Sequence, residues 1–207
     1  MYAHSKQISI SGIPAANAKA ALIMLHGRGA SAVDIMRIAH ELNAAEMTVY
    51  APQATNHSWY PYSFLAPVEE NEPALSSALT IVDEVVAQAL ADGFTADKIY
   101  FAGFSQGACL TLEYITRNAK QYGGAVAFTG GLIGEELNIS NYKGNFMGTP
   151  VLITTGDPDP HVPLSRVEES VAVLKGMNAN VTLKVYKGRQ HTISYDEIAL
   201  ANQLVFI

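Results

Sequence analysis

Short apolar runs alternate regularly with amphipathic stretches along the whole chain, and this pattern is what most constrains the fold. Runs of strand length occupy residues 21–25, 48–51, 98–102, 125–128, 151–155 and 181–186. The stretches between them place apolar residues three and four positions apart, as amphipathic helices do. Because no internal repeat or linker interrupts this order, we predict one α/β domain over residues 1–207. Its sheet is expected to be mainly parallel, with helices on both faces.

Several helix limits can be predicted from capping residues. Ser31 is expected to cap the first helix. The pairs Ser165 with Glu168 and Ser194 with Glu197 have the capping-box spacing and are expected to begin the last two helices. The long second helix is expected to pack through a stripe made of Leu75, Leu79, Val82, Val86 and Leu90.

Composition and charge exclude several classes of protein. The chain has 207 residues, of which 49% are hydrophobic and 15% charged, as in a globular enzyme. A net charge of −6 argues against nucleic acid and acidic membranes as partners. We find neither a signal peptide nor an apolar stretch of membrane-spanning length. The single cysteine, Cys109, excludes an internal disulfide and a multi-cysteine metal site, so we expect a cytoplasmic protein.

A glycine-flanked serine connects one expected strand with an expected helix. The pentapeptide Gly-Phe-Ser-Gln-Gly at residues 103–107 follows the strand at 98–102, and an apolar helix comes next. In a nucleophile elbow, a strained turn of this kind projects the serine oxygen at the top of the sheet. We therefore predict Ser105 as a nucleophile. Cys109, in the following helix, is expected to be a small buried hydrophobic residue.

A serine hydroxyl is a weak nucleophile and needs a base beside it. In this strand-turn-helix setting the expected chain order is serine, acid, histidine, and His161 and His191 are the histidines that follow Ser105. His191 lies in a loop after the last expected strand, so we predict it as the base. The proline-rich segment after the fifth expected strand offers two acids, Asp157 and Asp159, and the residues alone leave both open. His161 is expected at the rim of the cleft.

Two backbone amides are candidates to bind a developing oxyanion. One belongs to Gln106, directly after the nucleophile, and the other to Arg28, in the glycine loop after the first expected strand. The Arg28 side chain is expected to pair with a surface carboxylate. The long connection from Gln53 to about Ala74 carries several aromatic residues. It could form a wall for an apolar acyl or aryl group, a satellite core over the sheet edge, or a homodimer interface.

Taken together, the motifs resemble the phospholipase/carboxylesterase family of α/β hydrolases, which includes the acyl-protein thioesterases. The matching segments are residues 25–29, 51–53, 58–60, 103–107, 130–131, 156–163 and 188–191. The resemblance implies an α/β-hydrolase fold, with Asp159 as the triad acid. It also implies that the amides of Arg28 and Gln106 form the oxyanion hole and that Trp59 lies near the acyl pocket, together with Tyr60. The segment after Gly131 is short and polar, which argues against a long channel for fatty acyl chains.

We therefore expect a serine carboxylesterase that acts on short to medium acyl esters, thioesters included, through an acyl-enzyme. Ser105, His191 and Asp159 would form its triad. A small-molecule ester is the expected partner, and neither a metal nor an organic cofactor is required. A triad does not choose the leaving group, so a lactone hydrolase or a peptidase on the same fold is an alternative. A binding protein that keeps the fold and lacks turnover is another.

Overall fold

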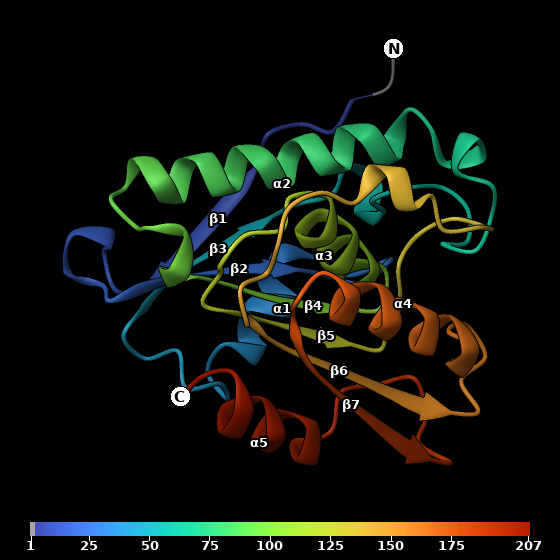
Figure 1. The fold of residues 1–207 in the computed structure, drawn as a ribbon. Helices are drawn as coiled ribbons and strands as arrows, with labels where there is room; N and C mark the ends of the chain where they lie inside the picture. The colour runs from blue at the N-terminus through green and yellow to red at the C-terminus, as the bar shows by residue number, and fades with distance from the viewer. Residues whose placement is uncertain (1–2) are drawn as a thin grey trace.

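A computed structural model describes residues 3–207 as a twisted sheet between two layers of helices (Figure 1). The sheet has seven strands in the order β1-β3-β2-β4-β5-β6-β7. All neighbouring strands are parallel except β1, which pairs antiparallel with β3 at one edge. The strands are β1 (Ile8–Gly12), β2 (Ala20–Leu25), β3 (Met47–Pro52), β4 (Ile99–Phe104), β5 (Gly124–Phe128), β6 (Pro150–Asp157) and β7 (Asn180–Lys187). This architecture confirms the predicted fold class.

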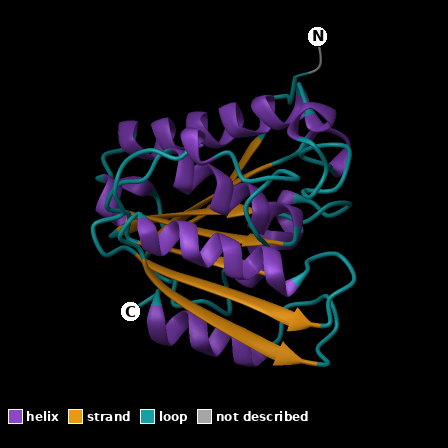
Figure 2. Cartoon of the chain, turned by 45° about the vertical axis from the view of Figure 1, so that its right-hand side comes forward, coloured by secondary structure: helices purple, strands orange, loops and turns teal. Residues whose placement is uncertain are grey.

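Helices cover both faces of the sheet, as Figure 2 shows. The α-helices are α1 (Ala32–Ile38), α2 (Ala74–Ala91), α3 (Gln106–Arg117), α4 (Leu164–Gly176) and α5 (Tyr195–Leu204). Short 3₁₀ helices occupy parts of the connections, at Ala15–Asn17, Thr55–His57, Val68–Asn71, Ala96–Lys98 and Ile139–Asn141. Buried residues of α2, α3 and α4 form one core on one face, and buried residues of α1 and α5 form a second core on the other.

Alternate residues of β2 pack into these two cores. Ala21, Ile23 and Leu25 of β2 point into the first core, whereas Leu22 and Met24 point into the second. A strand buried on both faces has no polar side to display, and this explains why the parallel strands read as continuous apolar runs. The six predicted strands correspond to β2 through β7.

The structure corrects three details of the predicted helices and strands. The N-cap of α4 is Pro163, so Ser165 lies inside the helix and does not begin it. Proline already supplies the extended backbone that precedes a helix, because its ring fixes φ. Along α2, Leu75, Val82 and Val86 are buried as predicted, but the buried face also includes Ala78, Val85 and Ala89, and Leu90 is 45% exposed. Small alanines let α2 approach the neighbouring elements closely, so size as well as apolarity decides which side of this helix is buried. Finally, β1 was not predicted.

Two capping predictions are confirmed. The Ser31 hydroxyl caps α1 by accepting from the Asp34 amide, and the Asp34 carboxylate accepts from the Ser31 amide. Ser194 is the N-cap of α5, and the Glu197 carboxylate accepts from its amide at 2.8 Å. By length and composition α2 is the one helix within residues 3–207 that could cross a membrane, but its apolar face is packed in the core of this fold.

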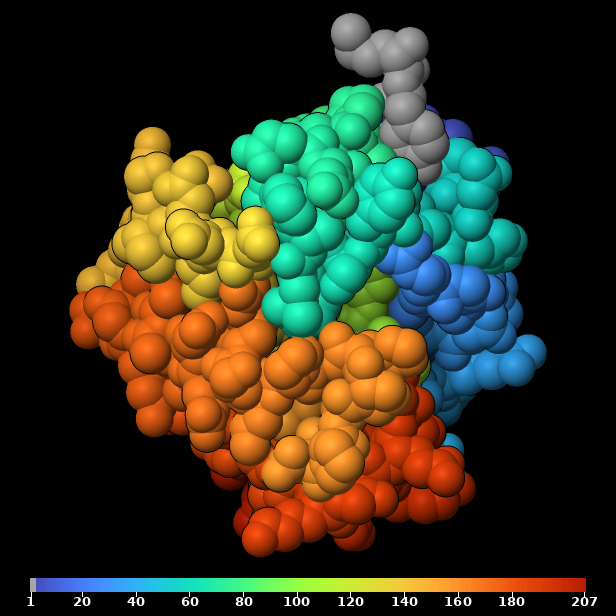
Figure 3. Space-filling view, turned by 90° about the vertical axis from the view of Figure 1, so that its right-hand side faces the viewer, coloured from blue at the N-terminus to red at the C-terminus, as the bar shows by residue number. Residues whose placement is uncertain are grey.

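The chain reverses its direction of progress across the sheet at β2, which has β3 on one side and β4 on the other. In open α/β sheets, the carboxyl ends of the strands beside such a reversal leave a crevice in which ligands bind. Figure 3 looks onto these ends. There the blue, teal and orange segments surround a hollow, and green atoms from the start of α3 are visible at its floor.

Candidate active site

Ser105 lies on a sharp turn between β4 and α3. Its backbone has a φ of 53° and a ψ of −118°, a combination that residues other than glycine rarely adopt. A Cβ atom on Gly103 would lie 2.4 Å from the carbonyl oxygen of Gly107, and one on Gly107 would lie 2.1 Å from that of Leu25. Both glycines are therefore needed for α3 to pack this closely against the strands. The turn places Ser105 at the N-terminus of α3, where the helix dipole favours negative charge.

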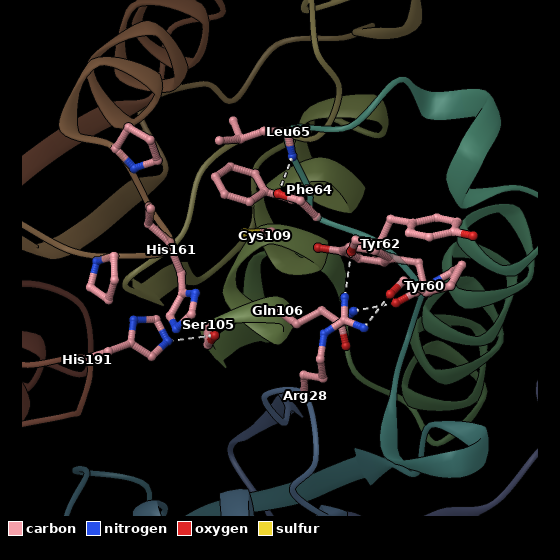
Figure 4. Close-up of a pocket in the computed structure, with 15 residues that line it drawn as sticks. Arg28, Tyr60, Tyr62, Phe64, Leu65, Ser105, Gln106, Cys109, His161 and His191 are labelled. Atoms are coloured by element: carbon pink, nitrogen blue, oxygen red, sulfur yellow. Dashed lines mark hydrogen bonds between the residues drawn. The ribbon is translucent and has the colours of Figure 1, made fainter.

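A continuous chain of hydrogen bonds joins Ser105, His191 and Asp159. Nε2 of His191 lies 2.8 Å from the Ser105 Oγ, as Figure 4 shows, and Nδ1 lies 2.8 Å from Oδ2 of Asp159. When the N–H at Nδ1 donates a hydrogen bond to the carboxylate, Nε2 carries no proton and can accept the serine proton. The fold thus brings together three side chains from separate connections, in an arrangement that can activate a hydroxyl.

Asp159 belongs to the connection between β6 and α4, and residues 158–163 of it are called the acid loop below. The carboxylate is fully buried. Its Oδ1 accepts from the amides of His161 and Val162, each at 2.9 Å. Burial raises the pKa of this carboxyl, but the hydrogen bonds from His191 and from the two amides outweigh burial and hold the pKa of Asp159 below its ordinary value. Asp157, the competing candidate, is the last residue of β6. Among residues 3–207, the carboxylate that pairs with the His191 ring is that of Asp159 and not that of Asp157.

His191 belongs to the connection between β7 and α5, and residues 188–194 are called the histidine loop below. A buried ion pair between Arg189 and Glu197 anchors this loop, with 3.1 Å between Nη1 and Oε2. Arg189 also donates to the hydroxyl of Thr129, just after β5, at 2.8 Å, and to the carbonyl of Thr192 within the loop. The guanidinium therefore ties the histidine loop to the strand next to the nucleophile.

Glu197 completes this anchor from the other end of the loop. Its side chain is fully buried, and it accepts from the amide and the hydroxyl of Ser194 and from the hydroxyl of Thr154 on β6. Sequence reasoning predicted Glu197 as a capping residue and missed its pairing with Arg189. The spacing of a capping box carries no information on which distant cation its carboxylate meets.

The amides of Arg28 and Gln106 belong to residues that line the same cavity as Ser105. Gln106 is the first residue of α3, and amides in the first turn of a helix lack an intrahelical partner. Neither amide donates to any acceptor within residues 3–207. Both are thus available to an oxygen of a bound molecule.

The buried side chain of His26 fixes the glycine loop that carries Arg28. Its Nε2 accepts from the Ala54 amide at 3.1 Å, so Nδ1 carries the proton and donates to the Gly27 carbonyl at 2.8 Å. Burial lowers the pKa of His26, which keeps the ring neutral and able to accept. In the sequence, His26 falls within the matching segment 25–29, and nothing there predicts a role of its own for it.

Contrary to the prediction, the Arg28 side chain pairs with no surface carboxylate among residues 3–207. Its guanidinium donates to the carbonyl oxygens of Pro61 and Tyr62, at 2.7 and 2.6 Å, and to the hydroxyl of Ser58 at 3.1 Å. Arginine presents several donors in a fixed plane, so one side chain can hold several carbonyl groups of a loop. Here it holds residues 53–74, called the aromatic connection below, in place beside the cavity.

The structure also corrects the prediction for Trp59. Its side chain is fully buried in the core that faces α2 and α3, and it is not part of the cavity wall. The indole Nε1 donates to the carbonyl of His26 at 2.8 Å, and the Trp59 amide donates to Oε1 of Gln106 at 2.9 Å. A buried indole needs a partner for its N–H, and the His26 carbonyl supplies one below the site. Trp59 therefore supports the glycine loop from beneath.

A cavity of about 610 Å³ opens beside Ser105. The aromatic connection forms one side of it, with Tyr60, Phe64 and Leu65, and the acid loop forms another (Figure 4). Tyr60, which was also predicted to contact the substrate, does line this cavity. The connection is thus both a satellite core, through Trp59, and a cavity wall.

The floor of the cavity includes the buried thiol of Cys109. Burial raises the pKa of this thiol to about 12, so it stays protonated and is a poor nucleophile. The prediction that Cys109 is a buried hydrophobic residue is confirmed. Within residues 3–207, no group of three or more His, Cys, Asp or Glu side chains is arranged to hold a metal ion.

Comparisons with known proteins show the family and the fold of this chain. Residues 10–205 match the phospholipase/carboxylesterase family. The fold is similar to a crystal structure of a phospholipase/carboxylesterase from Dyadobacter fermentans, with a TM-score of 0.99 and 64% sequence identity over 100% of this chain and 99% of that one.

Two curated relatives are more distant. Carboxylesterase SOBER1 of Arabidopsis thaliana is 26% identical over 150 residues, which cover 70% of this chain and 65% of that protein. Acyl-protein thioesterase 1 of Saccharomyces cerevisiae is 30% identical over 129 residues, which cover 59% of this chain and 55% of that protein. The matched segments therefore span less than two thirds of each of these relatives. Because the family match extends over nearly the whole chain, this protein belongs to the phospholipase/carboxylesterase family of α/β hydrolases.

Proposed function

We propose that this protein is a serine carboxylesterase that hydrolyses short to medium acyl esters, thioesters among them, through an acyl-enzyme. The observation that carries the proposal is the hydrogen-bonded chain from Ser105 through His191 to Asp159, beside a cavity and at the N-terminus of a helix. Membership of a family that includes carboxylesterases and acyl-protein thioesterases supports the same reaction class.

In the first half of the reaction, the Ser105 oxygen attacks the carbonyl carbon of the ester while Nε2 of His191 takes its proton. Ionised Asp159 stabilises the imidazolium that results. The carbonyl oxygen becomes negative, and the amides of Arg28 and Gln106 are the donors that would hold it. As the tetrahedral intermediate collapses, His191 returns the proton to the alcohol or thiol, which leaves, and the acyl group stays on Ser105.

In the second half, water takes the place of the leaving group. His191 removes a proton from water, the hydroxide attacks the acyl carbon, and the same amides hold the oxyanion. Collapse of this intermediate breaks the bond to the Ser105 oxygen, which takes back the proton from His191. The products are a free acid and the starting enzyme, so no external oxidant or reductant is needed.

The walls of the cavity support a limit on acyl length. Tyr60, Phe64 and Cys109 are buried, and the aromatic rings of the first two offer apolar surface that suits a hydrocarbon chain. A volume of about 610 Å³ lies within the range of sites for small ligands. We therefore place the acyl group against these side chains and expect rates to fall once the chain outgrows them.

Two assays on wild type and Ser105→Ala test the proposal. A fluorophosphonate should label wild type at residue 105 and leave Ser105→Ala unlabelled. Nitrophenyl esters of increasing acyl length should be hydrolysed best at short to medium chains. Labelling at a different residue would overturn the assignment of Ser105 as nucleophile. Correct folding with no turnover at any acyl length would overturn the proposal and favour a binding protein. A clear preference for lactones or peptides over these esters would instead support another hydrolase on the same fold.

The expected location and assembly belong to this proposal as well. We keep the cytoplasm as the location and a homodimer as the assembly to be tested, by fractionation and by light scattering after size exclusion. Of the aromatic residues in the connection, Tyr62 is 57% exposed, while Trp59, Tyr60 and Phe64 are buried. A dimer interface there would depend mainly on Tyr62.

A further inference from the structure

His161 is a second imidazole at the site, and the triad does not use it. It is exposed, lines the cavity, and has its ring centroid 5.2 Å from that of His191, with the two rings 78° apart. Its amide donates to Asp159, which fixes the backbone of His161 relative to the triad. Within residues 3–207 its ring makes no hydrogen bond. One donor and one acceptor of this ring are therefore available to a bound molecule.

The geometry of the reaction limits which part of a substrate can reach this ring. The carbonyl oxygen must face the amides of Arg28 and Gln106. The leaving atom must lie near Nε2 of His191, because it receives its proton there. The acyl chain then has to take the remaining direction, toward the buried wall that holds Phe64. Figure 4 shows His161 and His191 together on one side of Ser105, with Arg28 on the opposite side.

The acyl side and the leaving-group side of the cavity also differ in solvent exposure. The acyl side is enclosed by buried side chains such as Phe64, which is 6% exposed, whereas His161 lies at the open side of the cavity. A polar ring with free hydrogen-bonding groups suits the part of a substrate that stays near water. We propose that His161 is a specificity residue that hydrogen-bonds a second oxygen of the leaving group, close to the scissile bond. This enzyme therefore prefers esters of alcohols that carry such a second oxygen over esters of plain alkyl alcohols.

This inference rests on the proposed esterase function and is tested separately from it. Butyl butyrate and methoxyethyl butyrate share one acyl group and have leaving groups of nearly equal size, in which an ether oxygen replaces a methylene. The measured quantity is the ratio of their kcat/KM values in wild type, His161→Leu and His161→Gln. Comparing ratios between variants removes the difference in intrinsic reactivity of the two esters.

We expect wild type to favour the methoxyethyl ester and His161→Leu to lower that preference about fivefold, the effect of one ordinary hydrogen bond. His161→Gln should restore much of the preference, because an amide can also donate a hydrogen bond at this position. Both variants keep the backbone amide that binds Asp159, so a fluorophosphonate should still label residue 105 in each of them.

A second measurement separates the leaving group from the acyl group. Once the butyryl-enzyme has formed, the alcohol has left the site. Hydrolysis of the butyryl-enzyme should therefore proceed at the same rate in wild type and in His161→Leu. Slower hydrolysis of the butyryl-enzyme, an equal loss of kcat/KM on both esters, or a changed acyl-length preference would overturn the inference. Such results would leave the proposed function standing, since that depends on wild-type turnover and on labelling of residue 105.

Discussion

The acid loop and the histidine loop border the same site, but they are held in different ways. The acid loop is stiffened by three prolines, Pro158, Pro160 and Pro163, and the amides that fix Asp159 come from residues two and three positions further on. The histidine loop has no proline. It depends on the Arg189–Glu197 ion pair, which reaches Thr129 and Thr154 on other parts of the fold.

This difference implies that the two loops fail differently. A change at the carboxylate in the acid loop should remove activity and leave the fold intact, because the loop is determined by its own prolines and turns. A change in the anchor of the histidine loop should cost stability first, since it leaves a buried charge without its partner. Activity would fall there only as far as His191 moves away from Ser105.

The largest expected effect is on the acid itself. Asp159→Asn should lower kcat by about 10⁴-fold with little change in the urea midpoint, because an amide facing Nδ1 favours the wrong tautomer of His191. The measurement is steady-state hydrolysis of nitrophenyl butyrate. Asp157→Asn, two residues away in the same segment, is the matched control and should retain wild-type kcat. A large loss in Asp157→Asn with little loss in Asp159→Asn would show that the acid has been assigned to the wrong carboxylate.

Next in size is the anchor of the histidine loop. Glu197→Gln should lower the free energy of unfolding by about 3 kcal/mol, because the guanidinium of Arg189 stays buried without an opposite charge. Urea unfolding measures this loss. The double variant Arg189→Met with Glu197→Gln should recover much of it, since no buried charge is left uncompensated and the amide oxygen at residue 197 can still accept from Ser194. If the single change costs no more than a surface substitution does, the ion pair is not what holds this loop.

How far the fold could be predicted depends on how its strands are covered. Strands β2 to β6 are buried on both faces and read as apolar runs, and β7 alternates with period two, so all six could be located. In contrast, β1 consists of Ile-Ser-Ile-Ser-Gly at an exposed edge, where it gains its partner only by antiparallel pairing with β3. A run of five such residues does not by itself show that a distant strand will receive it.

The site could be predicted where chemistry restricts the residue type. Ser105, His191 and one of the two aspartates at 157 and 159 follow from the needs of acyl transfer and from chain order. Whether Trp59 faces the cavity or the core depends on how the connection lies over α3, and this is set by long-range contacts such as those of Arg28. The same limit applies to Arg189, whose partners come from three separate parts of the chain.

A smaller effect is expected at the contact between the histidine loop and β5. Thr129→Val keeps the branched shape but leaves the Nη2 group of Arg189 without its acceptor, which should cost about 1–2 kcal/mol of unfolding free energy. We expect kcat to fall a few fold with KM unchanged, because His191 loses part of its support and the cavity does not change. Thr155→Val is the matched control, since that buried hydroxyl donates only weakly, at 3.3 Å, to a neighbouring carbonyl. Equal effects of the two changes would contradict an anchoring role for Thr129.

The smallest expected effect is a dependence of stability on pH that belongs to the acid loop. The pKa of Asp159 is lower in the folded protein than its ordinary value, so the folded state binds this proton less readily than the unfolded chain. The resulting stabilisation is complete above the unfolded pKa, about 3.9 for aspartate, and is lost as the pH falls through the folded pKa.

Asp159→Asn lacks this contribution at every pH. The difference in unfolding free energy between wild type and Asp159→Asn should therefore shrink as the pH is lowered from about 6 to about 3. Urea titrations at several pH values measure it, and a difference that stays constant or grows on acidification would show that the contacts from His191, His161 and Val162 do not favour the ionised carboxylate.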